Sequence, residues 1–203
     1  RSAASIGRTM IAYIRGIVTE KNVNTVTVEC SGIGYEIFAT GRDIDKLSKG
    51  SEVLIHTYLR ISEDAHTLYG FLDKDDMAMF KKLIIVNGVG PKAALSIMNT
   101  LNSFDLKIAI VTEDYKAICA AVGVGSKIAK KIILELKEKV KPDDIGTLEA
   151  ADTSGNSVVS EVLEALVSLG YSNSEAYKVI KEIEVKNTDT TEDILKLALK
   201  KML

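Results

Sequence analysis

The first third of the chain alternates hydrophobic with polar residues in short runs. Thr25–Val28 alternates strictly, and Val53–Leu59 is rich in β-branched and aromatic residues. Between them, a turn at Gly32–Gly34 precedes the run Tyr35–Phe38. Runs of this length, bounded by glycine and polar residues, are typical of strands. About five strands in about 60 residues fit a small closed barrel, because closure leaves no exposed sheet edge. The pattern therefore predicts a β-barrel over residues 10–72.

A helical period replaces the alternation after the barrel. The apolar residues recur at the spacing of one buried helix face, and they are Met77, Phe80, Leu83 and Ile84. Two shorter periodic segments follow at Phe104–Val111 and Tyr115–Ala121. We expect Ser103 and Thr112, which precede them, to act as helix caps. The sequence therefore predicts an all-helical domain over residues 73–140.

One short motif occurs twice in this helical region. Its first copy is Asn-Gly-Val-Gly-Pro-Lys at residues 87–92, and its second is Val-Gly-Val-Gly-Ser-Lys at residues 122–127, so equivalent glycines lie 35 residues apart. Pro91 and Ser126 are expected to start the next helix, because proline suits the first helical position and serine suits the cap. The predicted unit is therefore helix, hairpin, helix, used twice.

Each hairpin has the composition of a phosphate-binding site. Two glycines around a valine permit positive φ angles and leave N–H groups pointing outward at a helix N-terminus, where they bind a phosphate oxygen without distinguishing bases. A single Gly-Val-Gly is more often a plain turn between helices, but two copies can hold the phosphates of both strands across a minor groove. We expect the valine to pack against the preceding helix. The candidate DNA-binding residues are Asn87, Gly88, Val89, Gly90, Lys92, Gly123, Val124, Gly125, Ser126, Lys127, Lys130 and Lys131.

The net charge of −2 conceals opposite charges in the two parts of the chain. Residues 1–141 hold 20 lysines and arginines against 16 carboxylates, whereas residues 142–203 hold 6 against 12. The first part can therefore approach nucleic acid, while the second would be repelled by it and is expected to bind a protein. Lysines also cluster directly after the second hairpin. We expect them either to contact phosphate or merely to form a solvated helix face.

The last quarter of the chain predicts a tethered bundle. Residues 141–157 are rich in Asp, Gly, Ser and Thr, which is typical of a flexible linker. Three short helices are expected in residues 158–203, at Val158–Leu169, Ser174–Ile183 and Thr191–Leu203. We expect Gly170 to end the first helix, and Thr190 or Thr191 to begin the third. So short a bundle has a thin core and modest stability.

The composition excludes several classes of protein. No apolar run approaches about 18 residues, so we expect no membrane span. Residues 1–9 lack the hydrophobic core of a signal peptide and are expected to be a cloning remnant before a natural start at Met10. Cys30 and Cys119 are too few for a disulfide framework or a zinc site, which fits a cytoplasmic protein. Neither a Walker loop nor a catalytic constellation is present, so we expect no catalytic residue, no metal and no cofactor.

The paired hairpins resemble helix-hairpin-helix DNA-binding domains. The run Leu83–Ala94, with Tyr69–Phe71 ahead of it, resembles the RuvA family of bacterial Holliday junction-binding proteins, and the resemblance covers nearly all of residues 10–203. It implies a multidomain β-then-α fold with an N-terminal OB-fold barrel, a middle tandem helix-hairpin-helix domain and a C-terminal UBA-like three-helix bundle. Members of the family usually have proline in place of Val122 and lysine in place of Ser126, so we expect the second hairpin to grip phosphate less tightly than the first.

The resemblance also implies partners. The chain is expected to bind four-way junction DNA as a homotetramer or an octamer, and to recruit the RuvB ATPase motor for branch migration, with the RuvC resolvase cooperating. A three-helix bundle this small cannot bury every large side chain. Leu169, Tyr171 and Leu199 are therefore expected to be either core residues or the apolar patch that faces the motor.

Glu63 and Asp64 lie in the polar hairpin tip Ser62–His66. A solvated turn is the plainest interpretation, but in the RuvA family a matching acidic pair forms a pin at the centre of the tetramer, and the resemblance assigns that role to these two residues. Two rival functions stay open. One is a magnesium-dependent nuclease that uses the two carboxylates, and the other is a DNA-repair scaffold that binds ordinary duplex.

Overall fold

The computed structural model describes residues 10–140 and 190–202, and between them residues 161, 162, 165, 166, 168–171, 175, 176, 179, 180 and 183. The described residues divide into two compact units. The first unit runs to residue 106 and also contains residues 115–132. The second contains residues 107–114 and the chain from residue 133 onward. The predicted linker and the residues before Met10 lie outside the described residues.

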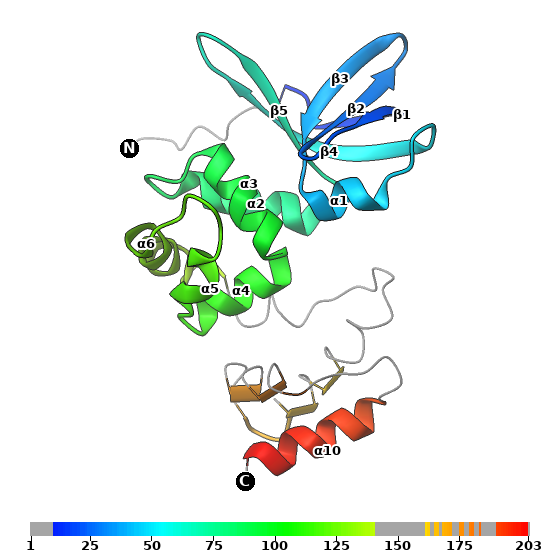
Figure 1. Ribbon diagram of the computed structural model, residues 1–203. Helices are drawn as coiled ribbons and strands as arrows, with labels where there is room; N and C mark the ends of the chain where they lie inside the picture. The colour runs from blue at the N-terminus through cyan, green and yellow to red at the C-terminus, as the bar shows by residue number, and fades with distance from the viewer. Residues whose placement is uncertain are drawn as a thin grey trace. The chain divides into compact units, whose positions relative to one another are not determined.

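Five strands form a closed barrel in the order β1-β2-β3-β5-β4, which confirms the predicted OB-like fold (Figure 1). The strands are β1 (Tyr13–Lys21), β2 (Thr25–Cys30), β3 (Ile33–Phe38), β4 (Glu52–Ile61) and β5 (His66–Phe71). All neighbours are antiparallel except β3 and β5, which pair in parallel. The β2–β3 turn is Ser31–Gly32, both with positive φ, so it begins one residue before the predicted Gly32–Gly34 turn. Ile33 already pairs with Cys30, which places it in β3.

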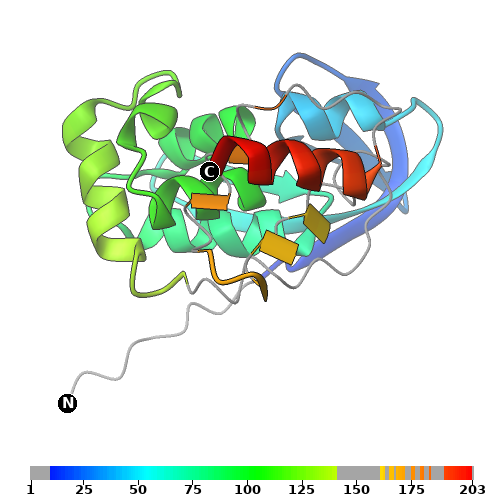
Figure 2. The same ribbon diagram turned by 90° about the horizontal axis from the view of Figure 1, so that it is seen from below.

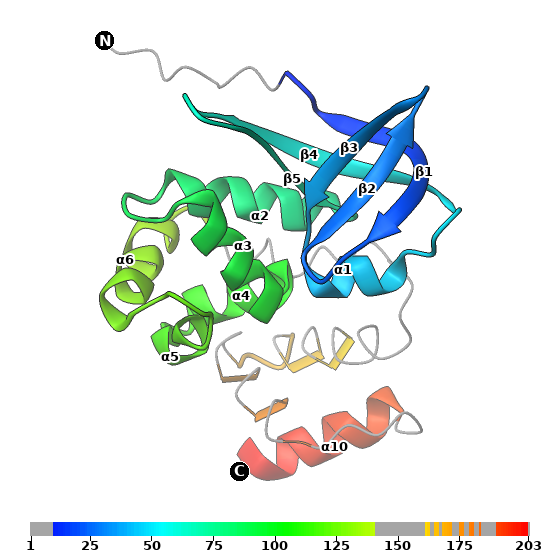
Figure 3. The same ribbon diagram turned by 45° about the horizontal axis from the view of Figure 1, so that its top comes forward.

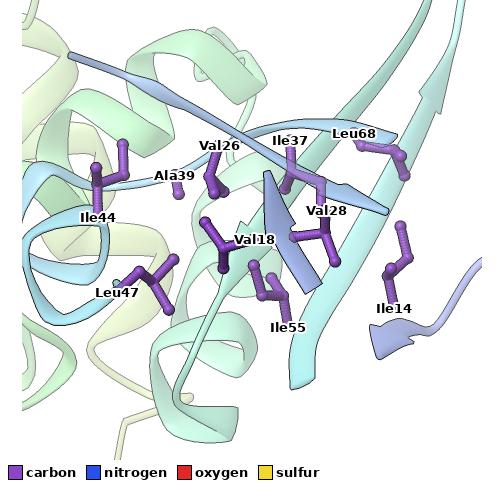
Figure 4. Packing of buried hydrophobic residues seen from close by; sticks show 10 residues of the cluster. All are labelled: Ile14, Val18, Val26, Val28, Ile37, Ala39, Ile44, Leu47, Ile55 and Leu68. Atoms are coloured by element: carbon purple, nitrogen blue, oxygen red, sulfur yellow. The ribbon is translucent and has the colours of Figure 1, made fainter. Parts of the chain in front are cut away.

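Aliphatic side chains from the inward faces of the strands fill the barrel interior (Figure 4). The buried residues are Ile14, Val18, Val26, Val28, Ile37, Ala39, Ile44, Leu47, Ile55 and Leu68. Ile44 belongs to the short helix α1 (Gly41–Lys46), and Leu47 directly follows it. Burying each large aliphatic side chain contributes about 1.5–3 kcal/mol, so this cluster supplies most of the barrel's stability.

Residues 73–140 contain five helices: α2 (Lys74–Ile85), α3 (Pro91–Thr100), α4 (Ser103–Val111), α5 (Tyr115–Cys119) and α6 (Ser126–Leu136). The predicted buried face of α2 is confirmed, because Met77, Phe80 and Leu83 are buried.

The predicted caps of α4 and α5 are wrong. Asn102 caps α4, since its Oδ1 accepts from the N–H of Asp105 at 2.7 Å, while Ser103 is already helical. Thr112 ends α4 rather than starting α5, because its N–H and its hydroxyl both donate to the carbonyl of Ile108.

The barrel and the first helices share one core. α2 packs against β4 and β5 (Figure 3). The ring of Phe80, fully buried in α2, lies 5.6 Å from Tyr58, 5.6 Å from Tyr69 and 5.1 Å from Phe71 between ring centroids. Aromatic pairs at such distances add about 0.5–1.5 kcal/mol each beyond the area that they bury. The helix that leads into the first hairpin is therefore fixed to the barrel.

A second joint fixes the helix that leaves the first hairpin. The N–H of Gly41 in α1 donates to Oδ1 of Asn99 in α3 at 2.8 Å. The guanidinium of Arg42 donates to the carbonyl of Met98, also in α3, at 2.6 Å. Both helices that flank the first hairpin are thus attached to the barrel.

The C-terminal region ends in helix α10 (Thr191–Met202), a continuous helix in the view from below (Figure 2). Thr190 caps it, since its hydroxyl accepts from the N–H of Asp193 and the Asp193 carboxylate accepts from the N–H of Thr190. The predicted stop at Gly170 is confirmed by its φ of +97° and by the bond from the N–H of Tyr171 to the carbonyl of Leu166 at 3.2 Å. The two other predicted helices of the bundle fall largely outside the described residues.

Candidate nucleic-acid interface

The two hairpins are built by the same backbone hydrogen bonds. In the first hairpin the bonds are Val86 N–H to Leu83 (3.0 Å), Val89 N–H to Val86 (2.9 Å) and Ala94 N–H to Gly90 (2.9 Å). In the second hairpin the equivalents are Ala121 N–H to Ile118 (3.2 Å), Val124 N–H to Ala121 (3.1 Å) and Ala129 N–H to Gly125 (3.0 Å). Every partner is displaced by the same 35 residues that separate the two sequence motifs. The repeated motif therefore encodes a repeated backbone.

The two glycines of each hairpin have different roles. The first glycine has a positive φ, +95° at Gly88 and +81° at Gly123, so a side chain there would be strained. The second glycine does not need this freedom: φ is −84° at Gly90, and Gly125 is not among the residues with positive φ. The expectation that both glycines of a hairpin adopt positive φ is therefore wrong for the second.

Open space surrounds the second glycines, as it does the first. A Cβ placed on Gly90 or on Gly125 would meet no heavy atom within 4 Å. Neither the backbone angle of Gly90 nor crowding by neighbouring atoms at either position calls for glycine. A bare backbone in front of a helix start lets another molecule approach the main chain closely, which explains glycine at these positions.

Exposed N–H groups line this open space. Within the described part of the chain, the N–H groups of Gly88, Gly90, Gly123 and Gly125 bond to no protein acceptor. All four glycines are exposed. These donors stand at the N-termini of α3 and α6, where the helix dipole favours an anion. Each hairpin thus presents main-chain donors that suit a phosphate oxygen.

The valines between the glycines face inward. Val89 is 4% exposed and Val124 is 5% exposed, which confirms the expectation that they pack back into the protein. Their side chains are therefore unavailable to a ligand, and these two candidate DNA-binding residues can contribute only through their backbone.

The first residues of the two helices correspond in register. Pro91 is the first residue of α3, as predicted. Ser126 is the first residue of α6 rather than its cap, since the carbonyl of Gly125 accepts the first helical bond from Ala129. The predicted cap at Ser126 is therefore wrong by one position.

The candidate basic side chains differ in their surroundings. Lys92 and Lys127 are exposed and occupy the second position of their helices. Lys130 is exposed as well, but its Nζ lies 4.8 Å from the ring centroid of Tyr115, a cation–π contact. Lys131 is half-buried. Lys92 and Lys127 are thus the lysines that stand directly at the glycine donors.

The turn residues before the first glycines are both exposed. Asn87 and Val122 occupy equivalent positions, and the side chain of Val122 is 87% exposed. The hydroxyl of Ser96, in α3, donates to the carbonyl of Val122 at 2.9 Å. Sequence reasoning missed Ser96, because a lone serine within a helix gives no signal of a bond to a residue 26 positions away.

Glu63 and Asp64 are the tip of the β4–β5 hairpin. The last strand pair is Ile61 with His66, and the N–H and the hydroxyl of Ser62 donate to the carbonyl of Ala65 at 2.9 and 3.0 Å. Both carboxylates project from a two-residue loop and are exposed. Among the described residues no group of three histidine, cysteine or acidic side chains could hold a metal ion.

The C-terminal candidates differ in exposure. Leu169 is 60% exposed, whereas Tyr171 and Leu199 are half-buried. Leu197, which sequence reasoning did not single out, is a further exposed apolar side chain on α10. No helix in the described part of the chain is long and apolar enough to cross a membrane.

Three family models match the chain. The model described as RuvA N terminal domain matches residues 10–70, and that described as SAM-like helix-hairpin-helix tandem matches residues 80–138. The model described as RuvA, C-terminal domain matches residues 157–203.

Relatives align with nearly the whole chain. A protein of Lachnospira eligens is 43% identical over 205 residues, which cover 96% of this chain and 99% of the relative. A protein of Clostridium beijerinckii is 46% identical over 200 residues, covering 96% of this chain and all of the relative. A protein of Thermoanaerobacter sp. is 38% identical over 195 residues with the same coverage. Each of them is named Holliday junction branch migration complex subunit RuvA.

Proposed function

This chain belongs to the RuvA family, and from that membership we propose that it binds four-way DNA junctions as the non-catalytic, DNA-binding subunit of a branch migration complex. The ATP-driven motor of that complex is RuvB, and the chain itself holds the junction open. The relatives carry this role in their name, and the barrel followed by tandem hairpins is the architecture that the family models describe.

The observation that carries the proposal is the set of four exposed N–H groups at Gly88, Gly90, Gly123 and Gly125. Main-chain donors contact phosphate oxygens and carry no base information, so binding depends on the path of the backbone rather than on sequence. Lys92 and Lys127 stand beside these donors and add one positive charge to each hairpin. Two such sites per chain suit two phosphates on one duplex arm.

Selection for a junction over ordinary duplex is assigned to Glu63 and Asp64. In a fourfold assembly, eight carboxylates from four hairpin tips would surround the point where the arms meet. Two like charges about 4 Å apart repel by about 1 kcal/mol in water and by about 4 kcal/mol near a protein surface. A continuous duplex laid across the centre would press its phosphates onto these tips, whereas an open junction parts around them.

A competition experiment tests the proposal. A labelled four-way junction is bound to the protein and displaced with linear duplex of the same arm sequence, and then with a junction of scrambled sequence. We expect weak displacement by the duplex and full displacement by the scrambled junction. Equal displacement by duplex and junction would instead support a general duplex-binding scaffold.

The acidic tips are tested by charge reversal. The double variant Glu63→Lys with Asp64→Lys should bind linear duplex more tightly and lose preference for the junction. Glu29→Lys with Glu36→Lys makes the same change in charge at exposed positions elsewhere on the barrel and serves as the matched control. If the tip variant kept its junction preference and lost only a magnesium-dependent cleavage, the nuclease hypothesis would replace the present one.

The partner-binding surface is assigned to the C-terminal region. Leu169 is the candidate most exposed to solvent, and an exposed leucine suits a protein contact better than a DNA contact. Leu169→Ala should leave junction binding unchanged and weaken branch migration driven by RuvB. Circular dichroism checks that the helices remain folded. Assembly as a tetramer or an octamer, and cooperation with the RuvC resolvase, belong to the same proposal and are tested by mass measurement with each partner.

A further inference from the structure

The turn of the second hairpin is held by a side chain from outside its own motif. Ser96 lies in the middle of α3, and its Oγ–H donates to the carbonyl of Val122 at 2.9 Å. Helix α3 begins at the first hairpin, and Val122 is in the turn of the second. The bond therefore links the two hairpins directly, across 26 residues of sequence.

This bond fixes the direction of one of the exposed donors. The chain contains no cis peptide bond among its described residues, so the peptide between Val122 and Gly123 is trans. In a trans peptide the C=O and the N–H point in opposite directions. Because the carbonyl of Val122 points toward Ser96, the N–H of Gly123 points away from α3. That N–H is one of the four that have no protein acceptor in the described chain.

The local bond across this turn, from the N–H of Val124 to the carbonyl of Ala121 at 3.1 Å, does not fix the peptide plane, because turns of types I and II both keep such a bond and differ by a flip of the central peptide. The side chain of Val122 is 87% exposed and makes little packing contact. Gly123, with a φ of +81°, has the widest backbone freedom of any residue type. A peptide flanked by an exposed residue and a glycine can rotate as a unit, which would turn the N–H away from a ligand. A hydrogen bond from another part of the protein to the C=O or the N–H of this peptide is the simplest means of selecting one orientation.

We propose that Ser96 is a positioning residue for phosphate binding at the second hairpin, because it orients the N–H of Gly123 and fixes the turn relative to α3. This inference rests on the proposed function, since the oriented donor is assigned to a DNA phosphate. Ser96 does not touch the phosphate. It acts through the Val122–Gly123 peptide, and it makes the spacing of the two hairpins a property of the folded protein rather than of the bound DNA.

The primary test compares junction affinity for three variants of α3. Ser96→Ala removes the donor and should weaken binding about fivefold, the equivalent of one hydrogen bond. Ser96→Thr keeps a hydroxyl at the same position and should restore most of the affinity. Thr100→Ala is the matched control, since it removes another hydroxyl from α3, one that bonds to the carbonyl of Ser96 itself, and it should leave affinity unchanged.

A mutant cycle separates positioning from a general loss of stability. Ser96→Ala and Lys127→Ala act on the same hairpin, so their effects on affinity should be less than additive. Ser96→Ala and Lys92→Ala act on different hairpins, so their effects should add. A destabilised protein would lose the same factor on both backgrounds, and that outcome would overturn the proposal.

Nuclear magnetic resonance of the free protein gives a readout that needs no DNA. Ser96→Ala should shift the amide resonance of Gly123, while the amide of Gly88 stays unchanged. Unaltered Gly123 resonances together with unaltered junction affinity would contradict the proposal that Ser96 positions the turn. If the parent protein failed to prefer junctions, the proposed function would fall, and the Gly123 amide would still decide whether Ser96 orients the turn.

Discussion

The first and second hairpins have the same backbone but different support. The first follows α2, a 12-residue helix whose Phe80 lies in the aromatic core shared with the barrel. It leads into α3, which begins with Pro91 and is bonded to α1 through Asn99 and Met98. The second follows α5, a helix of five residues, and has no proline. Its turn is bonded to α3 through the hydroxyl of Ser96.

This difference shows that the geometry of a binding site and its rigidity have different origins in the sequence. Local sequence repeats the turn, because the same three backbone bonds recur over residues 83–94 and 118–129. How firmly the donors stay in place depends on contacts with other parts of the chain, such as those of Phe80 with the aromatic residues of the barrel for the first copy and that of Ser96 with Val122 for the second. A site held in its bound shape before the ligand arrives loses less entropy on binding. We therefore expect the first hairpin to contribute more binding energy than the second.

The largest effect is expected from filling the open space in front of each helix. Gly90→Val should fold normally, since φ is −84° and a Cβ would meet no protein atom, but its side chain would keep phosphate from the donors. Losing one charge-assisted hydrogen bond costs about 2 kcal/mol, or about 30-fold in affinity. Gly125→Val should cost less, because the second hairpin is held less rigidly. Junction titrations at one salt concentration measure both variants, and an equal loss would contradict the ranking.

The next effect separates the two glycines of one hairpin. Gly88→Ala places a side chain at a φ of +95°, which costs about 1–2 kcal/mol. For a chain of this size, that lowers the thermal unfolding midpoint by about 2–8 °C. Gly90→Ala should leave the midpoint unchanged or raise it slightly, because its backbone angle is ordinary.

The same contrast should be weaker in the second hairpin. Gly123→Ala carries comparable strain, with φ at +81°, but this turn follows a helix of only five residues and can relax more readily. Calorimetry of the four alanine variants measures the comparison. A large drop for Gly90→Ala or Gly125→Ala would mean that the second glycine is needed for folding after all.

A smaller effect should be equal in the two hairpins. Lys92 and Lys127 are exposed and occupy the same helical position. Each neutralised phosphate contributes about 0.9 to the slope of log affinity against log salt. Lys92→Ala and Lys127→Ala should therefore each reduce the slope by about this amount, since the slope depends on the number of phosphates neutralised and not on how firmly each one is held. Unequal slopes would show that only one hairpin reaches a phosphate.

Much of this architecture follows from local sequence. The strand runs around Val26 and Val53 predict the barrel, and the glycine motif predicts both hairpins with Pro91 at a helix start. These features succeed because a turn or a strand depends on residues within a few positions of each other. The inward valines Val89 and Val124 are predictable for the same reason.

What the sequence could not supply depends on competing local bonds, on backbone angles and on distant contacts. The caps at Ser103 and Thr112 are wrong because Asn102 competes for the same helix start and Thr112 bonds backward to Ile108. Gly88 and Gly90 have different roles because their backbone angles differ, and the sequence does not reveal these angles. Ser96 illustrates the limit best, because its partner lies in another repeat.

The smallest effect concerns the joint that supports the first hairpin. Asp43 lies in α1 beside Gly41 and Arg42, the two residues that bond to α3. Burial, followed by the charge of nearby Asp76, raises the pKa of Asp43 above its ordinary value of 3.8. Its Oδ2 is buried and has no hydrogen-bond partner within the described chain. At neutral pH the folded protein therefore carries a carboxylate that would be better solvated in the unfolded chain.

The sign of the pH dependence follows from this raised pKa. Above the raised pKa of the folded state, the charged form is disfavoured and the full cost of folding with it applies. As the pH falls through that value the folded state takes up a proton before the unfolded state does, so stability rises. Well below 3.8 both states are protonated and the cost has gone. Asp43→Asn should raise the unfolding midpoint at neutral pH, and its advantage should shrink as the pH falls. Asp45→Asn, an exposed carboxylate of the same helix, is the control and should show no such trend. A midpoint difference independent of pH would mean that the charge of Asp43 does not weaken this joint.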